Sequence, residues 1–317
     1  MNAKQMFTVL FLAVTAVPTK AAFAADTVKW GHINATAFYW DVYAAISRGF
    51  MGEQKLEIEP LRIDTASQSI QILVTGAIDI LSSNTELALN AIDKGGDLVI
   101  IGNETARVPW SLMARPEIKT IADLKGKIIG VTQLTDASTT MTKLLLQKGG
   151  LGADDYQIIQ VGGTPTRYAA LVRGAVQATL LAQPADFKAE ANGMTRLGGV
   201  HDAFDGPAIV FVARRSWAQQ NRDIVTRFLR GAIAGMRWLQ DPTNKDEAVQ
   251  ILAKRIGVSE AEALQTYDLY MAEKVLSANG DLPAAHIRNY LSLSRPSVPE
   301  DVGKYVDFSY LERARSR

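Results

Sequence analysis

A short phrase that the chain repeats is the sequence feature that most restricts its fold. Residues 73–86 read LVTGAIDILSSNTE, and residues 171–184 read LVRGAVQATLLAQP. In each copy, apolar residues at i, i+3 and i+4 mark one face of a helix, and a glycine follows where a helix C-terminus needs a positive φ. The apolar run after the glycine is typical of a short buried strand. Each copy therefore predicts a helix, a glycine cap and a strand.

The pattern upstream of the two copies also repeats. Each copy is preceded by a predicted strand, helix and strand, at 28–33, 37–48 and 56–63 in the first case and at 127–132, 137–148 and 156–161 in the second. Strands that alternate with helices form mainly parallel sheets with helices on both faces. A ligand of such units binds beyond the carboxyl ends of the strands. We therefore expect two equivalent α/β units with a ligand cleft between them.

The segments outside the two units predict how they are connected. Extended apolar segments at 99–101 and 110–114 lead into the second unit, another at 206–217 follows it, and the remainder is predicted to be helical. The fold class that follows is α/β with two lobes, whose mainly parallel sheets are joined by two crossing hinge strands. The expected boundaries are residues 25–112 plus 213–317 for lobe 1 and residues 113–212 for lobe 2.

The N-terminus has the three parts of a secretory signal peptide. Lys4 precedes an apolar run at 6–17, and the small-x-small triplet Ala-Phe-Ala follows at 22–24. The apolar run has about half the length that a bilayer span requires, so we expect a signal peptide at 1–24 that is cleaved. The mature protein is expected to begin near Ala25 and to be soluble in a bacterial periplasm.

Composition excludes several classes of protein. The 34 Lys plus Arg residues nearly balance the 33 Asp plus Glu residues, so no strong field favours nucleic acid or an anionic membrane. The chain has no cysteine, which excludes disulfides and cysteine-based metal or nucleophile chemistry. Its histidines, His32, His201 and His286, show no metal-ligand spacing, and no G-x-S-x-G, HExxH or P-loop motif occurs. We therefore expect no enzymatic activity, no metal and no cofactor.

An ordered series of strings resembles the solute-binding proteins of ABC importers, in the branch for nitrate, taurine, alkanesulfonates and thiamine-pyrimidine precursors. The series is a secretory signal, LVTGAIDILSSN, IADLKGKIIGVT, LVRGAV and AQP, and then a long helix with DPTNKDEAVQIL. The resemblance covers about 28–300, and DLKGK at 123–127 is its most telling part. It implies a type II periplasmic binding fold that clamps a ligand and delivers it to a permease with a cytoplasmic ATPase. Gln177 departs from the pattern, because the family usually has an acid there.

The loops after the strands are the candidates for ligand contact. In LTDAS, Thr135 or Asp136 is expected to cap a helix whose N–H groups would suit a carboxylate or sulfonate, although capping alone is an alternative. In AFYW, at 37–40, an aromatic ring in the cleft would favour an organic ligand over nitrate, although these rings could also join the core. The predicted ligand-binding residues are Asn34, Thr36, Phe38, Trp40, Ser83, Asn84, Thr85, Glu104, Thr132, Thr135, Asp136, Ala137, Ser138, Thr164 and Gln183.

Charged residues near these loops narrow the ligand class. Glu86 and Asp136 disfavour a purely anionic ligand unless both point away, whereas Arg107 or Arg167 is available to a carboxylate. We therefore predict a monomeric periplasmic binding protein for a small organic anion or zwitterion, either sulfonate- or taurine-like or a carboxylate. Three alternatives stay open: binding of a thiamine-pyrimidine precursor, a ligand-binding partner of a sensor, and a thiamine-pyrimidine synthase-like enzyme, which the absence of cysteine disfavours.

Overall fold

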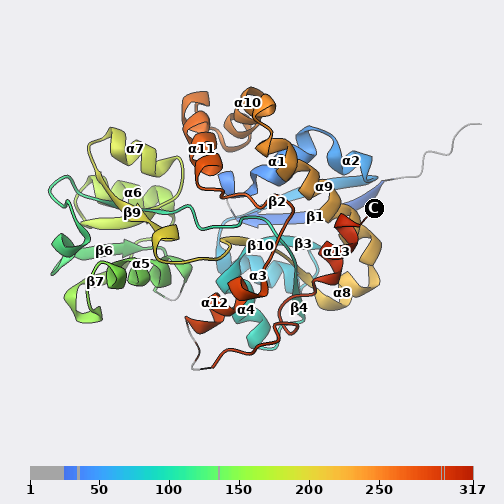
Figure 1. The fold of residues 1–317 in the computed structure, drawn as a ribbon, viewed down its shortest axis with the longest axis horizontal. Coiled ribbons are helices and arrows are strands. Elements are labelled where there is room, and N and C mark those ends of the chain that lie inside the picture. The colour runs from blue at the N-terminus through green and yellow to red at the C-terminus, as the bar shows by residue number, and fades with distance from the viewer. Residues whose placement is uncertain (1–24, 34–35, 135, 294, 296, 317) are drawn as a thin grey trace, which may run out of the picture.

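The strands of the chain pair into two separate five-stranded sheets (Figure 1). The computed structural model describes residues 25–33, 36–134, 136–293, 295 and 297–316, so the predicted signal peptide, Asn34 and Thr135 lie outside it. The first sheet has the order β2-β1-β3-β10-β4, with β1 Asp26–Ile33, β2 Leu56–Ile63, β3 Ile80–Asn84, β4 Leu98–Asn103 and β10 Ile209–Arg214. The second has the order β7-β6-β8-β5-β9, with β5 Ser111–Ala114, β6 Ile128–Val131, β7 Gln157–Gln160, β8 Ala178–Leu181 and β9 Thr195–Gly199.

The two sheets have the same topology. In the first, β1 is parallel to β2 and β3, and β10 is antiparallel to β3 and β4. In the second, β6 is parallel to β7 and β8, and β5 is antiparallel to β8 and β9. Each sheet therefore has one strand that runs against the other four. The predicted α/β fold with mainly parallel sheets is confirmed, and we call each sheet with its helices a lobe.

Helices cover both sheets (Figure 1). In lobe 1 these are η1 Ala37–Tyr39, α1 Trp40–Ser47, α2 Phe50–Glu53, α3 Ala66–Val74, α4 Thr85–Asp93, α8 Arg215–Gln220, α9 Arg222–Gln240, η5 Pro242–Asn244, α10 Lys245–Ile256, α11 Glu260–Ala272, α12 Ala284–Ser292 and α13 Ser309–Arg315. In and next to lobe 2 these are η2 Ile121–Leu124, α5 Ala137–Lys148, η3 Ala153–Asp155, α6 Thr164–Val172, α7 Ala185–Ala191 and η4 Val200–Asp202.

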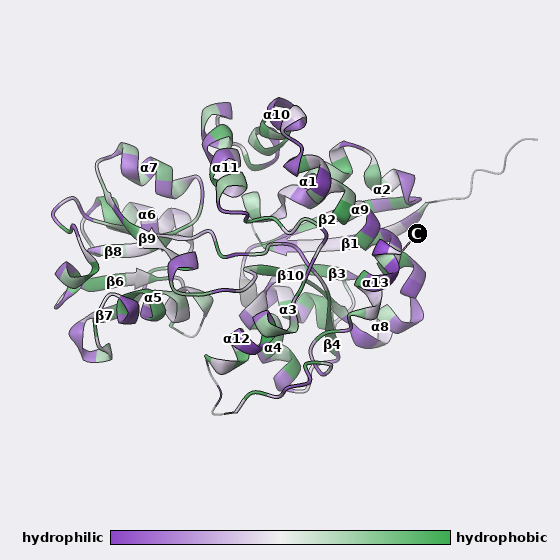
Figure 2. Cartoon of the chain, viewed as in Figure 1, coloured by the Kyte–Doolittle hydropathy of each residue, from purple (hydrophilic) through white to green (hydrophobic). Residues whose placement is uncertain are grey.

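The hydrophobic residues are concentrated on the strands and on the inner helix faces, as Figure 2 shows for β3 and β10. Helix α9 buries an apolar stripe that includes Val225, Phe228 and Leu229, and the ring of Phe228 meets Phe211 of β10 edge-on at 5.3 Å between centroids. None of the helices in the described part of the chain combines the length and apolar composition that a bilayer span requires. The C-terminal helices therefore serve as cover for the first sheet.

The repeated phrase forms the same cap in both lobes. After α3, the N–H of Gly76 donates to the carbonyl of Leu73 at 3.0 Å, and Gly76 has a φ of 79°. After α6, the N–H of Gly174 donates to the carbonyl of Leu171 at 3.1 Å, and Gly174 has a φ of 75°. Strand β3 or β8 then follows. The predicted helix, glycine cap and strand are confirmed in both copies.

Gln177, which departs from the family pattern, keeps the function of the acid at the matching position of lobe 1. There, the carboxylate of Asp79 accepts a hydrogen bond from the N–H of Lys29 at 2.9 Å. In lobe 2, the side-chain oxygen of Gln177 accepts one from the N–H of Ile128 at 3.0 Å, and its amide also donates to Gly174. An amide oxygen accepts this bond as a carboxylate does. The substitution therefore preserves the connection between the glycine cap and the neighbouring strand.

Two connections cross between the lobes. The first, at 104–110, leads from β4 to β5, and the second, at 200–208, leads from β9 to β10. We call these the crossing segments. The expected boundaries, after residues 112 and 212, fall inside β5 and β10. The β-branched run of β10 pairs with β3 and β4, so the whole strand belongs to the first sheet. A division within the crossing segments fits the strand pairing better.

The glycine caps give a first prediction. Gly76→Ala and Gly174→Ala would each force a side chain into positive φ, and the added Cβ would lie 3.0 Å from the Arg214 guanidinium or 3.3 Å from that of Arg115. Each variant is expected to lose about 1 kcal/mol and to lower Tm by about 2–4 °C in a thermal melt. Gly52→Ala is the control, because Gly52 lies in helix α2 with open space around its Cβ position. Equal melting temperatures for all three variants would contradict the prediction.

Candidate ligand-binding site

A cavity of about 280 Å³ lies between the two lobes, where strands of both sheets end. Residues from the ends of β1, β2, β3, β6, β7 and β8 or from the loops after them contribute to its wall. The lining residues are Ile33, Thr36, Phe38, Tyr39, Asp64, Thr65, Asn84, Trp110, Thr132, Gln133, Asp136, Gln160, Gly162, Gly163, Thr164, Arg167 and Ala182. The carboxyl edges of two parallel arrays therefore face each other across it, as such folds require of a ligand site.

Equivalent positions of the two repeats line opposite walls of the cavity. Numbers in the second copy exceed those in the first by 98, so Asp64 matches Gly162, Thr65 matches Gly163 and Asn84 matches Ala182. All six line the cavity. The duplication thus places the same backbone positions on both walls, while the side chains at these positions differ.

Six of the predicted residues lie in the cavity wall. Three come from lobe 1 and three from lobe 2: Thr36, Phe38, Asn84, Thr132, Asp136 and Thr164. Their contact with a ligand stays a prediction.

The other predicted residues that the structure describes lie behind the wall. Trp40, Ser83, Thr85, Glu104, Ala137, Ser138 and Gln183 are absent from the lining. Trp40 is rotated into a cluster with Tyr267 and Tyr270, and its indole N–H donates to the carbonyl of Ala248 at 3.1 Å. Ala137 is half-buried, at the first position of α5.

Hydrogen bonds hold several of these polar side chains inside the protein. The Thr85 hydroxyl donates to the carbonyl of Pro207 at 2.8 Å. The amide of Gln183 donates to the Pro109 carbonyl at 2.6 Å and to the Asp186 carboxylate at 2.8 Å. Ser83 is buried and donates to the carbonyl of Asn84. A loop position after a strand thus predicts proximity to the cleft but not the direction of the side chain.

Ser138 and Glu104 are further from the cavity than the sequence predicts. The Ser138 hydroxyl accepts from the N–H of Thr132 at 2.8 Å and donates to Asp136 at 2.6 Å, so it braces the loop after β6 from behind. Glu104 is completely buried at the start of the first crossing segment. Both residues support the site from behind the wall instead of lining it.

Arg167 is the lining residue with the most unusual environment. Its side chain is only 3% exposed, because it lies on the buried face of α6 beside Ala170 and Leu171. The guanidinium donates to the carbonyls of Leu180, at 3.1 Å, and Gly162, at 2.8 Å. It also donates to the hydroxyls of Thr132 and Thr164. All four acceptors are uncharged.

The Arg167 charge has no ion-pair partner within the described part of the chain. Burial lowers the pKa of Arg167 to about 10, and the charge of Asp136 partly opposes this effect. The side chain therefore still carries its charge at neutral pH. A guanidinium has five N–H groups, and one on Nη2 stays available beyond the four bonds described. A buried cation with neutral partners and a free donor is a favourable site for an anionic group.

The N-terminus of α6 points to the same place. Gly163 is its N-cap and makes no side-chain capping bond, and Pro165 follows in the first turn. The lining residues Gly162 and Gly163 have no side chain that would keep an oxyanion away from the backbone. The positive end of the helix dipole and the free N–H groups therefore add to the attraction of Arg167 for an anion.

The N-terminus of α5, predicted as a possible anion site, is occupied by the protein itself. The Asp136 carboxylate accepts from the N–H of Ser138 at 3.0 Å and from the N–H of Thr139 at 3.4 Å. Capping is therefore the observed role of Asp136, which also lines the cavity. An anionic ligand group is expected to bind away from this carboxylate, on the side of Arg167.

One acidic side chain, Asp136, lines this part of the cavity, and a second, Glu86, lies near it outside the lining. Across from Asp136, Glu86 at the start of α4 accepts a hydrogen bond from Thr140 of α5 at 3.3 Å. Burial raises the pKa of Glu86, and the charge of Asp136 raises it further, whereas the Thr140 bond lowers it. Together with Arg167, these groups give the region one cation and two acidic side chains. The Glu86–Thr140 bond also connects the two lobes directly.

Two aromatic rings form an apolar part of the wall. Phe38 from η1 and Trp110 from the first crossing segment meet edge to face, with 6.3 Å between ring centroids. Tyr39 is held beside them because its hydroxyl donates to the Ile33 carbonyl at 3.1 Å. These rings can bury the apolar body of a ligand whose charged group is bound elsewhere.

The predicted ligand-binding set lacks several lining residues, although the sequence carries two signals for them. Arg167 is one of these residues and was expected only to be available to a carboxylate. Arg167 precedes Ala170 and Leu171 by three and four positions, which places it on the apolar face of a helix. A cation buried on such a face is usually paired with an anionic group. Asp64 and Thr65 follow β2 at positions that match Gly162 and Gly163 in the repeat. Thr164 is among the predicted residues, and the repeat predicts the lobe 1 counterpart of the segment at 162–166. Trp110 had no comparable signal.

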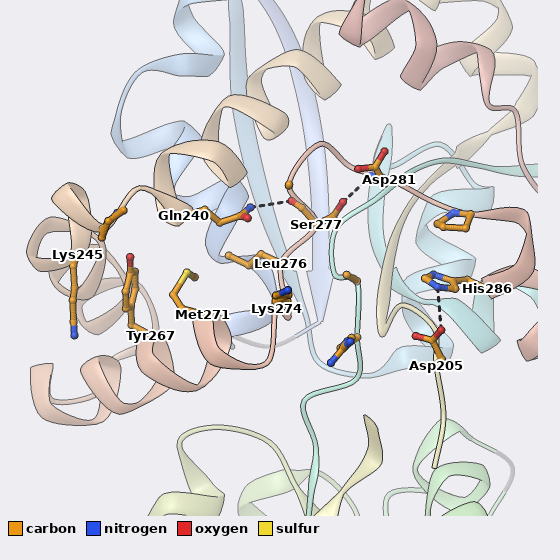
Figure 3. A pocket seen from close by; sticks show the side chains of 15 residues that line it. Asp205, Gln240, Lys245, Tyr267, Met271, Lys274, Leu276, Ser277, Asp281 and His286 are labelled. Atoms are coloured by element: carbon orange, nitrogen blue, oxygen red, sulfur yellow. Dashed lines mark hydrogen bonds and ion pairs between the residues drawn. The ribbon is translucent and has the colours of Figure 1, made fainter. Parts of the chain in front are cut away.

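A larger hollow of about 920 Å³ lies on lobe 1 behind the crossing segments (Figure 3). Tyr267 and Met271 of α11 form one side, and His286 of α12, paired with Asp205 at 3.5 Å, lies at the other. No strand end of either sheet contributes to this hollow. Among the described residues, no group of three or more His, Cys, Asp and Glu side chains is placed to hold a metal ion. The inter-lobe cavity is therefore the candidate site.

Comparisons with known proteins agree with this geometry. The family model described as NMT1/THI5 like matches residues 37–245. A Brucella abortus protein, named as a binding protein without a stated ligand, is 26% identical over 81% of this chain and 80% of its own length.

Solved structures share the fold. The alkanesulfonate-binding protein SsuA of Xanthomonas axonopodis pv. citri, solved bound to MOPS, has a TM-score of 0.69 at 18% identity and covers 84% of this chain and 90% of its own. The periplasmic nitrate-binding protein NrtA of Synechocystis PCC 6803 has a TM-score of 0.65 at 18% identity and covers 77% and 70%. The chain therefore belongs to the NMT1/THI5 like family and has the fold of periplasmic ABC substrate-binding proteins.

Proposed function

We propose that this protein is the periplasmic solute-binding component of an ABC importer and that it captures a small organic anion or zwitterion between its lobes. The observation that carries the proposal is Arg167, a buried cation in the cavity wall without a carboxylate partner among the described residues. A sulfonate or carboxylate of the ligand would provide the missing negative charge and accept the free N–H. The N-terminus of α6 would stabilise the same group.

The opposite side of the region favours a ligand that also carries an amine. Asp136 lines the cavity and Glu86 lies across from it, so a purely anionic ligand would meet repulsion there. An amine would pair with these carboxylates while Phe38 and Trp110 cover the apolar part of the ligand. Binding of MOPS, a zwitterionic sulfonate, by the Xanthomonas protein supports this class of ligand. Taurine-like sulfonates and amino carboxylates fit the pattern best.

The residues proposed to contact the ligand are divided between the two lobes, so ligand binding favours closure of the lobes. Arg167 and the α6 N-terminus belong to lobe 2, whereas Phe38 and Asn84 belong to lobe 1. A ligand that contacts both sets stabilises the conformation in which they approach each other. Lys188 of α7 and Glu262 of α11 add an ion pair of 2.9 Å between the lobes. These groups bind and orient the ligand, and no covalent step is involved.

The remaining parts of the proposal concern location and partners. The cleaved signal peptide would direct the protein to the periplasm, where it would act as a monomer and deliver its ligand to a permease with a cytoplasmic ATPase. A receptor could accept the same closed lobes, and a permease and ATPase encoded beside this protein would favour import. Neither role involves nucleic acid.

A thiamine-pyrimidine precursor is a second candidate ligand. The Phe38 and Trp110 rings suit a flat heterocycle, and Asp136 and Asn84 suit its amino group and ring nitrogens. The family model is named in part for THI5-like proteins. A synthase-like activity is not proposed, because the chain lacks the cysteines of the iron motif that such an enzyme would need.

A thermal-shift screen of the mature protein tests the ligand class. The compounds are taurine, ethanesulfonate, alanine, benzoate, nitrate and a 4-aminopyrimidine. A ligand at 100 times its Kd is expected to add about 2.7 kcal/mol of stability and to raise Tm by several degrees. Zwitterionic sulfonates or amino carboxylates should give the largest shift. A shift with nitrate alone would contradict the proposed class, and no shift with any compound would remove the main support for import.

Replacement of Arg167 tests the anion site. Arg167→Met is expected to weaken binding of the best ligand from the screen at least tenfold in isothermal titration calorimetry, because a charge-assisted hydrogen bond is lost. Arg167→Lys keeps the charge without the planar donor group, so it should retain part of the affinity. The control is Arg173→Met, at the exposed end of the same helix. Unchanged affinity in Arg167→Met would place the anion elsewhere.

Filling the cavity from lobe 1 provides an independent test. Asn84 is half-buried and lines the cavity, so Asn84→Trp should abolish ligand binding while Tm without ligand changes by less than about 2 °C. Gln71→Trp on the exposed face of α3 is the control for the added ring. A tryptophan at Ser138, another predicted ligand-binding residue, would not serve as this test, because Ser138 is buried. A large loss of stability in Asn84→Trp would show that Asn84 belongs to the core.

A further inference from the structure

Two carboxyl groups lie together in the interior between the first crossing segment and α1. Asp41 of α1 and Glu104 are each 0% exposed. None of their four carboxylate oxygens meets hydrogen-bond geometry with a donor in the described part of the chain. Each carboxyl group is the other's interaction partner. The cavity wall does not include either of them. This pair is a costly feature that the proposed ligand site does not explain.

Among the described groups that act on the pKa values of the two carboxyls, none is a cation. Ser82 of β3 faces Glu104 with a hydroxyl. The Glu104 charge contributes to the raised pKa of Tyr39 and Tyr43, which lie close to Asp41 in the chain. It also contributes to the raised pKa of Tyr270 of α11.

The other titratable groups nearby are two arginines and a histidine. Arg62 and Arg255 act on Tyr43 and are not among the groups that act on either carboxyl. His32 of β1 packs its ring against Tyr39, at 5.1 Å, and Tyr43, at 5.8 Å. Two ionised carboxylates in this environment would repel each other, and the backbone N–H groups of Asp41 and Val42 and the Ser82 hydroxyl offset this repulsion only in part. A proton held between them removes one charge and supplies a donor between the two groups, because the protonated group donates to the carboxylate.

The pair connects the hinge to the ligand cavity. Next to Glu104, the hydroxyl of Thr105 accepts from the N–H groups of Ala208 and Ile209, both at 2.9 Å. The N–H of Glu104 itself donates to the Ile209 carbonyl at 3.2 Å. Residues 104–105 thus join both crossing segments. On the other side, Asp41 is the second residue of α1, which follows directly after η1, and Phe38 and Tyr39 of η1 line the cavity.

We propose that Asp41 and Glu104 share one proton that fixes the crossing segments against α1 and thereby positions η1 at the ligand cavity. Loss of this proton leaves two buried negative charges, which push the first crossing segment and α1 apart. Asp41 and Glu104 are therefore positioning residues that act on the cavity wall from behind. The proposal holds whatever ligand the cavity binds, so its failure and that of the proposed function are distinguishable.

The expected pH dependence has a definite sign. Burial raises the pKa of Asp41 to about 7, and burial together with the charge of Asp41 raises the pKa of Glu104 well above its usual range. Groups whose pKa is raised on folding bind more protons in the folded state than in the unfolded state. The stability they contribute is present at low pH and is lost as the pH rises through the folded-state values. The loss should therefore extend through pH 7 into the alkaline range.

The mature protein and its variants test this proposal in thermal melts between pH 6 and pH 9. The wild-type Tm is expected to fall by roughly 5–10 °C over this range because of the pair. In Glu104→Gln, a neutral amide donates to the Asp41 carboxylate. The slope of Tm against pH should therefore fall to less than about half of the wild-type value. Asp41→Asn is the second variant and should have the same effect. If both variants keep the wild-type slope, the pair shares no proton and the proposal is overturned.

A matched control and a local measurement separate positioning from general stability. Asp186 in lobe 2 is equally buried but is paired with Arg196 at 3.0 Å, so Asp186→Asn should lower Tm and keep the wild-type slope between pH 6 and pH 9. Hydrogen exchange, compared as protection factors, should show that amides at 37–41 and 104–108 lose protection at pH 9 in the wild type but not in Glu104→Gln. If the amides of α5 lose as much protection at pH 9 as the amides at 37–41 and 104–108, the positioning role is overturned.

Discussion

Each sheet is completed by a strand that the chain brings from the other lobe, and the rest of the structure depends on this pairing. Strand β5 follows β4 of lobe 1 but pairs with β8 and β9, and strand β10 follows β9 of lobe 2 but pairs with β3 and β4. Without these strands each sheet would split into a three-stranded part and a lone strand with exposed edges. The two crossing segments are therefore a condition of folding, and they hold the carboxyl edges of both sheets close enough to form one cavity.

Most of this architecture is predictable from the sequence because it depends on periodic apolar patterns and on glycines with positive φ. The repeat predicts the helix, cap and strand around Gly76 and Gly174, and the same backbone bonds form in both lobes. The positions at which the chain passes from one lobe to the other are less predictable. The run at 209–212 is apolar and β-branched, and this composition suits a central strand of either sheet. Only the pairing with β3 and β4 assigns it to lobe 1.

The candidate site is predictable as a set of loops but not as a set of side chains. Loop positions depend on the strand order, which the repeat reveals, whereas side-chain direction depends on a rotation of a few tens of degrees about a helix or strand. Trp40 follows the lining residues Phe38 and Tyr39 in one helical turn, yet its ring packs on Tyr267. Glu104 is polar and near the crossover, which made it a candidate, but it is buried against Asp41. Polarity near a cleft thus does not distinguish a ligand contact from an internal support.

The two copies have diverged in a way that assigns different tasks to the two lobes. Helix α3 is capped by Thr65, whose hydroxyl accepts from the N–H of Gln68 at 3.4 Å, whereas its counterpart α6 has no side-chain cap. The position in α3 that matches Arg167 is Ser69, which is also buried but carries no charge. Under the proposed function, charge recognition is therefore concentrated in lobe 2. A ligand that first binds its anionic group there would still expose its apolar body, and the rings of lobe 1 can cover that body only when the lobes close. If the proposed function holds, the asymmetry of the repeat makes closure follow anion binding, whereas two identical cavity walls would not impose this order.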